Sequence, residues 1–461
     1  MIFSLLLISV LGAPRAPVEA EVVVFVPKLE QATQLLPFFT AAGSRSNLLR
    51  PEAWRSEAHP LIDADVTRKE ALALVGIDAS TSLTSSRLGD ASIACVTVSD
   101  VEKYRKAADA KLARLGEVFE KVEGGVSLYA TRDPLGRVLA AYVLSGRESC
   151  AISGHGRSVE AQFPLLSKLV VKPAQGPGFS LAAKVPGVLQ LIVPSGASHG
   201  VLSLNAKDLV LTVDGKSKNV ALAQLAGAGP SALGTFSTAG MALLRARVAK
   251  TQVPALVEQA VRQFPGAAVL LPLAREAASL FTGNAALLLS HVKVTTGLRT
   301  REARFFALRG ALLAEVSDVP AMTALLEKLD PKSLSFREGT LSVSMEGSML
   351  VVSNDAEVRA RAVAALAKAN GKQVHGVEFE VDPKLVARGL QQVPLLEAVQ
   401  APELAGLVAA GTELGPLLLA TERVSGFLDS AAGAVHTGRL IWQLDAAKFA
   451  PDAGAPFDGG H

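Results

Sequence analysis

Short runs of apolar residues recur along the chain and predict strands. Residues 22–26 and 93–98 are almost continuously apolar, whereas residues 126–131 alternate between apolar and polar side chains. Between such runs lie stretches with apolar residues at intervals of three and four, which is the spacing of one helix face. The longest stretch runs from Val101 to Val122 and ends before two glycines. Strands interrupted by single helices are typical of the α+β class.

The second half of the chain repeats the order of the first. The sequence Val-Ser-Asp-Val at residues 98–101 recurs at residues 316–319, each time after an apolar run and before an amphipathic stretch. Gly-Asp-Ala at residue 89 opens the first of these runs, and Gly-Asn-Ala at residue 283 opens a similar run. We therefore predict a tandem duplication of an antiparallel sheet with helices packed on one face.

This alignment assigns counterparts to the two cysteines of the chain. Cys95 aligns with Leu289 and Cys150 with Leu350, so both cysteines are expected at core-facing positions of strands. The second copy then carries an additional hairpin between residues 291 and 312.

The first twenty residues predict an export signal. Residues 2–11 form an apolar run of suitable length, and Val18-Glu19-Ala20 offers small residues at the usual cleavage spacing. No Lys or Arg precedes the run, so a buried strand or a misassigned start codon is the alternative interpretation. We expect the mature protein to be periplasmic or secreted.

The mature chain divides into three parts. We predict a first α+β repeat at residues 21–229, a second at residues 230–449 and a disordered tail at residues 450–461. The boundary near Gly229 lies in a stretch rich in Ala and Gly, and the tail is rich in Pro, Gly, Asp and Ala.

Composition limits the classes of function. Hydrophobic residues make up 49% of the 461 residues and charged residues 19%, so the chain can bury a large core. After the first twenty residues no run of about 18 apolar residues occurs, and we predict no transmembrane span in the mature chain. The net charge is +3 with both signs interspersed, which argues against nucleic acid as a partner.

Four short stretches also carry a resemblance to a known family. They are residues 22–27, 76–78, 88–91 and 98–100. In these stretches the chain resembles an uncharacterised family of bacterial extracytoplasmic proteins, classed only as a domain of unknown function. The resemblance implies an exported α+β protein and brings no activity, cofactor or catalytic residue.

Two motifs suggest hydrolase chemistry but lack its context. Residues 63–67 (Asp-Ala-Asp-Val-Thr) match the nucleophile motif of haloacid-dehalogenase-like phosphatases, without the buried strand before it or a later acidic pair. A helix start at Thr67 is the simpler interpretation. Ser198 lies in a Gly-x-Ser-x-Gly sequence, yet a strand follows it where a nucleophile elbow requires a helix.

The other polar residues give no further site. The seven histidines are scattered, and no phosphate-binding loop is present. We therefore predict no catalytic, cofactor-binding or metal-binding residues. Asp100 and Asp318 recur at equivalent points, where a ligand site is one interpretation. Helix capping, with each Asp in the first turn beside a Ser N-cap, is the simpler one.

Cys95 and Cys150 are the candidate site residues of the chain. In an oxidising compartment they can form a structural disulfide, which would contribute roughly 4 kcal/mol by closing the loop between them. Two buried thiols that pack as small hydrophobic side chains are the alternative.

Together these features predict an exported, non-enzymatic protein of the cell envelope. Its expected partner is an apolar small molecule such as a lipid, or an envelope protein. The apolar stretch at residues 395–419 could line a cavity or belong to an ordinary core. A structural or assembly component of the envelope is the alternative, and a hydrolase a further one.

Overall fold

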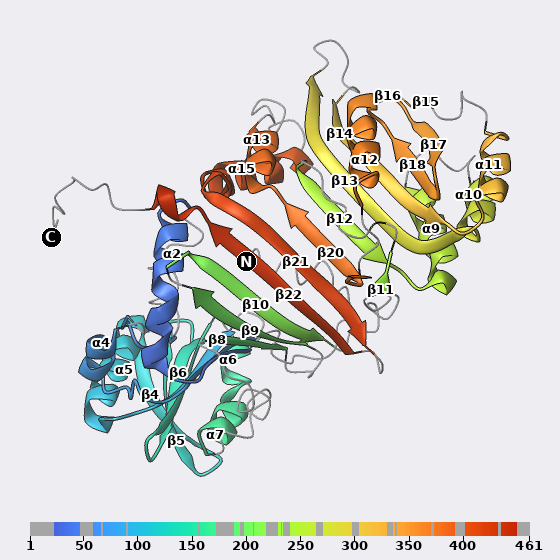
Figure 1. The fold of residues 1–461 in the computed structure, drawn as a ribbon. Helices are drawn as coiled ribbons and strands as arrows, with labels where there is room; N and C mark the ends of the chain where they lie inside the picture. Colours follow the sequence, from blue (N-terminus) through green and yellow to red (C-terminus); the bar gives the residue numbers. More distant parts are fainter. Residues whose placement is uncertain are drawn as a thin grey trace. The chain divides into compact units, whose positions relative to one another are not determined.

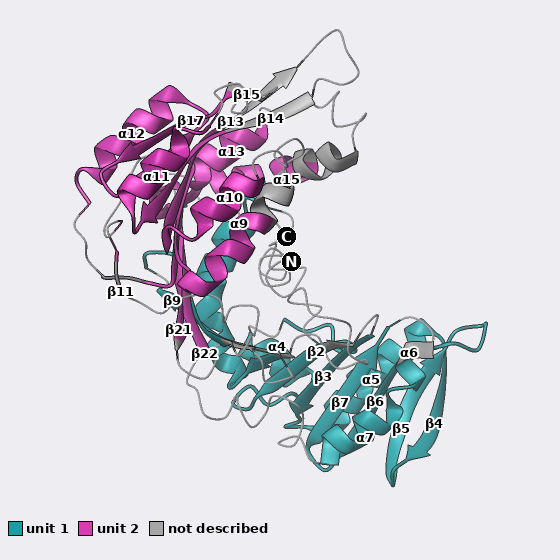
Figure 2. Cartoon of the chain, turned by 90° about the vertical axis from the view of Figure 1, so that its right-hand side faces the viewer, with its two compact units in different colours: residues 1–218, 449–461 teal, residues 219–448 magenta. Residues whose placement is uncertain are grey.

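The computed structural model divides the chain into two compact units (Figure 1, Figure 2). Unit 1 comprises residues 1–218 and 449–461, and unit 2 comprises residues 219–448. The structure describes residues 23–46, 59–65, 68–88, 91–154, 157–171, 189–193, 198–205, 207–217, 229–231, 233, 240–263, 271–296, 304–329, 335–336, 339–369, 373–391, 402–431 and 435–449. The predicted export signal and the tail at residues 450–461 lie outside these ranges.

Unit 1 is an antiparallel sheet with helices. The strands follow one another across the sheet in the order β10-β9-β8-β1-β2-β3-β7-β6-β5-β4. Their bounds are β1 (Val23–Val26), β2 (Leu83–Leu88), β3 (Ala91–Thr97), β4 (Glu117–Glu123), β5 (Val126–Arg132), β6 (Val138–Ser145), β7 (Glu148–Ser153), β8 (Leu189–Val193), β9 (Ser198–Asn205) and β10 (Val210–Ser217). The helices are η1 (Leu29–Leu35), α2 (Leu36–Gly43), α4 (Lys69–Leu74), α5 (Val101–Leu115), α6 (Arg157–Glu160) and α7 (Phe163–Val171).

Unit 2 contains a sheet with the order β22-β21-β20-β12-β13-β14-β18-β17. The strands are β12 (Ala242–Arg247), β13 (Phe281–Thr296), β14 (Arg304–Val316), β17 (Ser342–Glu346), β18 (Met349–Ser353), β20 (Val377–Val381), β21 (Thr421–Ala431) and β22 (Val435–Leu444). Two short pairs are separate, β11 (Gly229–Pro230) with β19 (Gln373–Val374) and β15 (Ser335–Phe336) with β16 (Gly339–Thr340). The helices are η5 (Lys250–Gln252), α9 (Val253–Gln263), α10 (Leu271–Ala278), α11 (Val319–Leu326), α12 (Ala356–Leu366), α13 (Pro383–Gln391), α15 (Pro402–Leu419) and η8 (Ala446–Lys448).

The two sheets share one strand order. Strands β10-β9-β8-β1-β2-β3-β7-β6 of unit 1 correspond to β22-β21-β20-β12-β13-β14-β18-β17 of unit 2, and unit 1 adds the β4–β5 hairpin at its end of the series. The prediction of an α+β fold with a duplicated antiparallel sheet is confirmed. The units divide after Lys218, whereas the predicted boundary residue Gly229 belongs to β11, which pairs with β19 of unit 2.

Helices cover both faces of the central strands, in place of the single face that we predicted. In β6, Ala140 and Tyr142 pack in the same core as Tyr104 of α5, whereas Ala141 and Val143 pack with Phe163 of α7. A strand that is apolar on both sides needs a cover on both faces to remove these side chains from water.

The helix predicted to reach Val122 is shorter than expected. It ends at Leu115, and residues 117–123 form strand β4. Gly116 marks the change because its backbone lies against Arg132 of β5, where a Cβ atom would collide with the Arg132 carbonyl oxygen. Leu115, Phe119 and Val122 keep helical spacing, and residues 117–123 do not alternate between apolar and polar side chains, so the sequence pattern favours the longer helix.

The predicted alignment of the two copies is wrong for the cysteines. Strand β13 corresponds to β2, so the hairpin that we took for an insertion is β13–β14 itself, the counterpart of β2–β3. Two-residue turns with a glycine of positive φ, Gly146 and Gly347, precede β7 and β18 and fix the register. Counted from these turns, Cys150 corresponds to Val351 rather than Leu350.

Candidate functional site

Cys95 and Cys150 form a disulfide between neighbouring strands. Cys95 of β3 lies directly opposite Cys150 of β7, with a Cα–Cα distance of 4.1 Å. Both side chains are buried in the core between the sheet and α7. A buried disulfide at this place stabilises unit 1 and is shielded from redox partners in solution.

Asp100 and Asp318 cap helices. The carboxylate of Asp100 accepts a hydrogen bond from the Lys103 N–H at 3.1 Å, and Asp318 accepts one from the Ala321 N–H at 3.0 Å. The first of these hydrogen bonds lowers the pKa of Asp100. Each Asp is itself the N-cap, so the expectation of a Ser N-cap is wrong; Ser99 instead donates its backbone N–H to the Gly76 oxygen.

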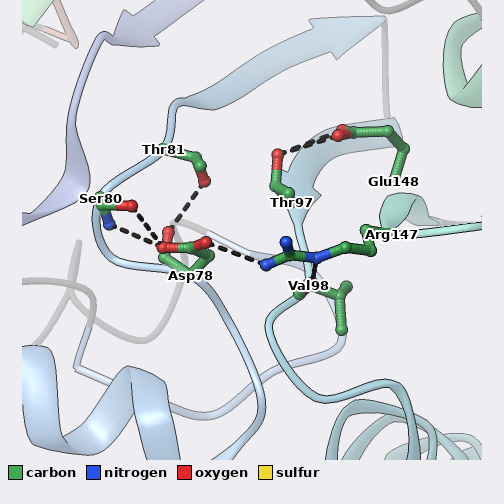
Figure 3. Close-up of polar contacts among 7 residues, drawn as sticks. All are labelled: Asp78, Ser80, Thr81, Thr97, Val98, Arg147 and Glu148. Atoms are coloured by element: carbon green, nitrogen blue, oxygen red, sulfur yellow. Dashed lines mark hydrogen bonds and ion pairs between the residues drawn. The ribbon is translucent and has the colours of Figure 1, made fainter.

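A polar cluster fastens the loop before β2 to the β6–β7 turn (Figure 3). Asp78 Oδ1 accepts hydrogen bonds from the hydroxyl and the N–H of Ser80, and Oδ2 pairs with Arg147 Nη2 at 3.1 Å. These hydrogen bonds, the Ser80 hydroxyl first, lower the pKa of Asp78. Arg147 also donates to the Val98 oxygen at 2.9 Å. The polar groups satisfy one another, which is the arrangement of a structural cluster.

A second polar network is buried beneath α5. His59 Nδ1 accepts a hydrogen bond from the Leu61 N–H at 3.2 Å, so the proton of the neutral ring lies on Nε2, 3.3 Å from the Tyr104 hydroxyl. That hydroxyl lies 2.8 Å from Ser149 Oγ. Burial lowers the pKa of His59 to about 3 and raises the pKa of Tyr104. Both side chains are therefore neutral at physiological pH and belong to the core.

The structure does not assemble the two hydrolase motifs into a site. Asp63 is half-exposed and forms an ion pair with Lys111 Nζ at 2.8 Å, and Thr67 lies outside the described residues. Ser198 is the first residue of β9, where it is paired in register with Val193 and Ser217. A residue within a strand ladder is not in the strand-to-helix turn that a nucleophile elbow requires.

The apolar stretch at residues 395–419 is described from residue 402 onwards, as α15. This helix packs on α13, with Gly411 lying against Leu390. Leu417 is buried. The described part of this stretch thus contributes to the core of unit 2.

A small recess lies on the sheet face of unit 2, over β12, β20, β21 and β22, which run side by side (Figure 1). Its volume is about 160 Å³. We call it the charged recess, because arginine and glutamate side chains from all four strands line it. Its lining residues are Leu243, Arg245, His375, Glu378, Phe379, Glu380, Arg423, Ser425, Gly426, Phe427, Arg439 and Ile441.

The strand register arranges these residues in two rows. Arg245 is opposite Glu378, Glu378 is opposite Phe427, and Phe427 is opposite Arg439. The second row lies two residues away along each strand and consists of Leu243, Glu380, Ser425 and Ile441. Because strand side chains alternate between faces, all eight belong to the same face.

Two ion pairs cross the recess and differ in exposure. Arg245 pairs with Glu378, and the two side chains are 20% and 16% exposed. Arg423 Nη2 lies 3.4 Å from Glu380 Oε1, with side chains 54% and 47% exposed. The Arg245–Glu378 pair is thus largely shielded from water, whereas the Arg423–Glu380 pair is open to solvent.

An aromatic stack bounds one side of the recess. The ring of His375 lies parallel to that of Phe427, with centroids 3.8 Å apart. His375 Nδ1 is 2.6 Å from Asp429 Oδ2, and Asp429 Oδ1 accepts a hydrogen bond from the Gly376 N–H at 2.8 Å. Asp429 thereby holds the imidazole ring against Phe427.

The corresponding strands of unit 1 lack this charge. Strands β1, β8, β9 and β10 contain two charged residues, Asp214 and Lys216, whereas β12, β20, β21 and β22 contain eight. The shared strand order therefore forms without a charged face. The recess was not predicted from the sequence. The only local signal is that Arg245 and Arg247, like Glu378 and Glu380, are two residues apart, which is the spacing of one strand face.

Comparisons of the chain with protein-family models, with curated proteins and with solved structures found no match. Within the described ranges, no helix combines the length and apolar character needed to cross a membrane. In the same part of the chain, no three or more His, Cys, Asp and Glu side chains gather into a group that could hold a metal ion.

Proposed function

We propose that the chain is an exported, non-enzymatic protein of the cell envelope that binds a protein partner through the charged recess. The observation that carries this proposal is the charged face of unit 2. The corresponding strands of unit 1 have the same order but almost no charged residues. The charged lining favours a polar partner over the apolar small molecule or lipid that the composition also suggested. A structural or assembly role in the envelope would use the same surface.

Export is supported by the disulfide between Cys95 and Cys150. Disulfides form and persist in oxidising compartments and are rare in the cytosol. The predicted signal at residues 1–20 points to the same compartment, and the periplasm or the cell exterior is the location that we propose.

The test is site-specific photo-cross-linking in cells that export the chain. A photoreactive side chain is placed at Ser425, which lines the recess, and in a matched variant at Ser342, an exposed serine of β17. We expect one protein to be cross-linked from Ser425 and not from Ser342. Failure to form an adduct at Ser425, or the same adducts from both positions, would contradict the proposal. A lipid retained by the purified chain in native mass spectrometry would instead favour the apolar ligand.

A further inference from the structure

We propose that the charged recess binds a carboxylate group of the partner, held by Arg423, while an apolar part of the same partner rests on the Phe427–His375 stack. This inference rests on the proposed function, because it names the chemistry that the recess recognises. It is carried by the charge balance, the openness of one ion pair and the size of the recess.

Arginine exceeds glutamate around the recess. Three arginines and two glutamates line it, and Asp429 beside it is engaged by His375 and the Gly376 N–H. Arginine binds carboxylates through planar, paired hydrogen bonds, which makes a carboxylate the natural complement of such a surface.

Arg247 adds a further positive charge on the same face of β12, two residues beyond Arg245. Its Nε and Nη1 atoms are buried and have no hydrogen-bond partner within the part of the chain that the structure describes. The guanidinium packs against Gly229 of β11, where a Cβ atom would collide with it. A guanidinium whose charge no described carboxylate neutralises biases the neighbouring recess toward anions.

Arg423 is an arginine of the recess that a ligand can reach. Its pair with Glu380 is long, and both side chains are about half exposed. Exposed ion pairs of this kind contribute little to stability. A ligand carboxylate can therefore replace Glu380 on Arg423 at small cost, whereas the less exposed Arg245–Glu378 pair stays in place.

The size of the recess sets the scale of the group that enters. A cavity of about 150 Å³ accommodates a benzene ring, and the charged recess measures about 160 Å³. Phe427, Leu243 and Ile441 provide apolar surface beside Arg423. A ring or short aliphatic group that carries one carboxylate matches this combination.

The competing explanation is that the charged pairs only stabilise the sheet. Cross-strand pairs do contribute to sheet stability. Unit 1, however, builds the corresponding four strands with almost no charge, so stability of the fold does not require the rows. A structural role alone also predicts that neutral and anionic ligands bind equally well.

The test uses the full chain and two isosteric probes, benzoate and the neutral benzamide, in ligand-observed NMR titrations. We expect benzoate to bind at least about tenfold more tightly than benzamide, because only benzoate forms charge-assisted hydrogen bonds with arginine. Arg423→Gln is expected to abolish this preference. The matched control is Arg275→Gln, which removes an arginine that is 55% exposed and paired with Glu258 elsewhere in unit 2, and it should keep the preference.

Equal binding of the two probes by the native chain, or a preference that survives in Arg423→Gln, would overturn the carboxylate proposal. The native-chain comparison needs no variant, so it decides even if Arg423→Gln folds poorly. A cross-link from Ser425 without any preference for benzoate would refute the carboxylate alone. Absence of the cross-link would refute the proposed function. Excess benzoate that prevents the Ser425 adduct from forming during irradiation would support both proposals.

Discussion

Leu313 of β14 lies directly opposite Val351 of β18, and both are fully buried in the core of unit 2. This pair occupies the place that the disulfide between Cys95 and Cys150 occupies in unit 1. The same position in the duplicated sheet is thus closed once by a covalent bond and once by apolar packing alone. The disulfide therefore adds stability to a site that the fold can also fill without it.

Replacing both cysteines with valine is expected to leave unit 1 folded but less stable. The loss should be about 2–4 kcal/mol, because the unfolded chain regains the freedom of the loop between the two strands. Denaturant unfolding followed by circular dichroism measures the change, and reductant should destabilise the native chain but not the double variant. An unfolded variant, or one as stable as the native chain, would show that the two sites are not equivalent.

The stability of unit 1 should fall as the pH is lowered through the range set by His59. The ordinary pKa of His is about 6.5, and burial lowers the pKa of His59 to about 3 in the folded chain. Between these values the unfolded chain binds a proton that the folded chain excludes. Stability is therefore fully present above about pH 6.5 and decreases toward pH 3, by at most about 1.4 kcal/mol per pH unit.

The His59 contribution can be isolated with two variants. His59→Gln should flatten the pH dependence of the unfolding free energy between about pH 6.5 and pH 4, although its absolute stability will drop with the lost hydrogen bonds. His291→Gln, which changes an exposed histidine of unit 2 and keeps the buried His59, is the matched control. Parallel slopes for all three proteins would mean that His59 is accessible to protons in the folded state.

Asp100→Ala and Asp318→Ala should each destabilise the protein by about 1 kcal/mol, because each removes the side chain that satisfies a free N–H at the start of a helix. Ser99→Ala should cost clearly less, since Ser99 contributes its backbone N–H to the Gly76 oxygen. Thermal unfolding of the three variants compares them. A larger loss of stability for Ser99→Ala than for Asp100→Ala would mean that the Ser99 side chain, and not that of Asp100, caps α5.

Local patterns were sufficient to predict the class of the fold. The apolar run that became β3 and the repeated Val-Ser-Asp-Val sequence are local signals, and they placed the junction of strand and capped helix correctly in both units. The β4 strand was missed because Phe119 and Val122 continue the helical spacing of α5. Only the contact of Gly116 with β5, which is distant in sequence, ends that helix.

The alignment of the two copies and the charged recess could not be predicted from local patterns. Both depend on which strands pair, and in which register. Gly89 and Gly283 suggested that β3 corresponds to β13, whereas the strand pairing makes β14 the counterpart of β3. The recess joins Arg245, Glu378, Phe427 and Arg439, which come together only once four strands have paired in register. Their charges were visible in the sequence, but their neighbours were not.

The Arg245–Glu378 pair should matter more for stability than an exposed pair of the same unit. Glu378→Ala removes the carboxylate that pairs with Arg245, a side chain only 20% exposed. It also removes the acceptor of the hydrogen bond from the backbone N–H of His375, at 3.0 Å. We expect a loss of about 2 kcal/mol, because polar groups left within the sheet face lose their acceptor. Glu258→Ala, which breaks the exposed pair with Arg275, should cost about 0.5 kcal/mol or less. Denaturant midpoints of the two variants measure the difference. Equal losses would mean that the Arg245–Glu378 pair is held no more firmly than an exposed pair elsewhere in unit 2, and the description of it as a fixed pair would fail.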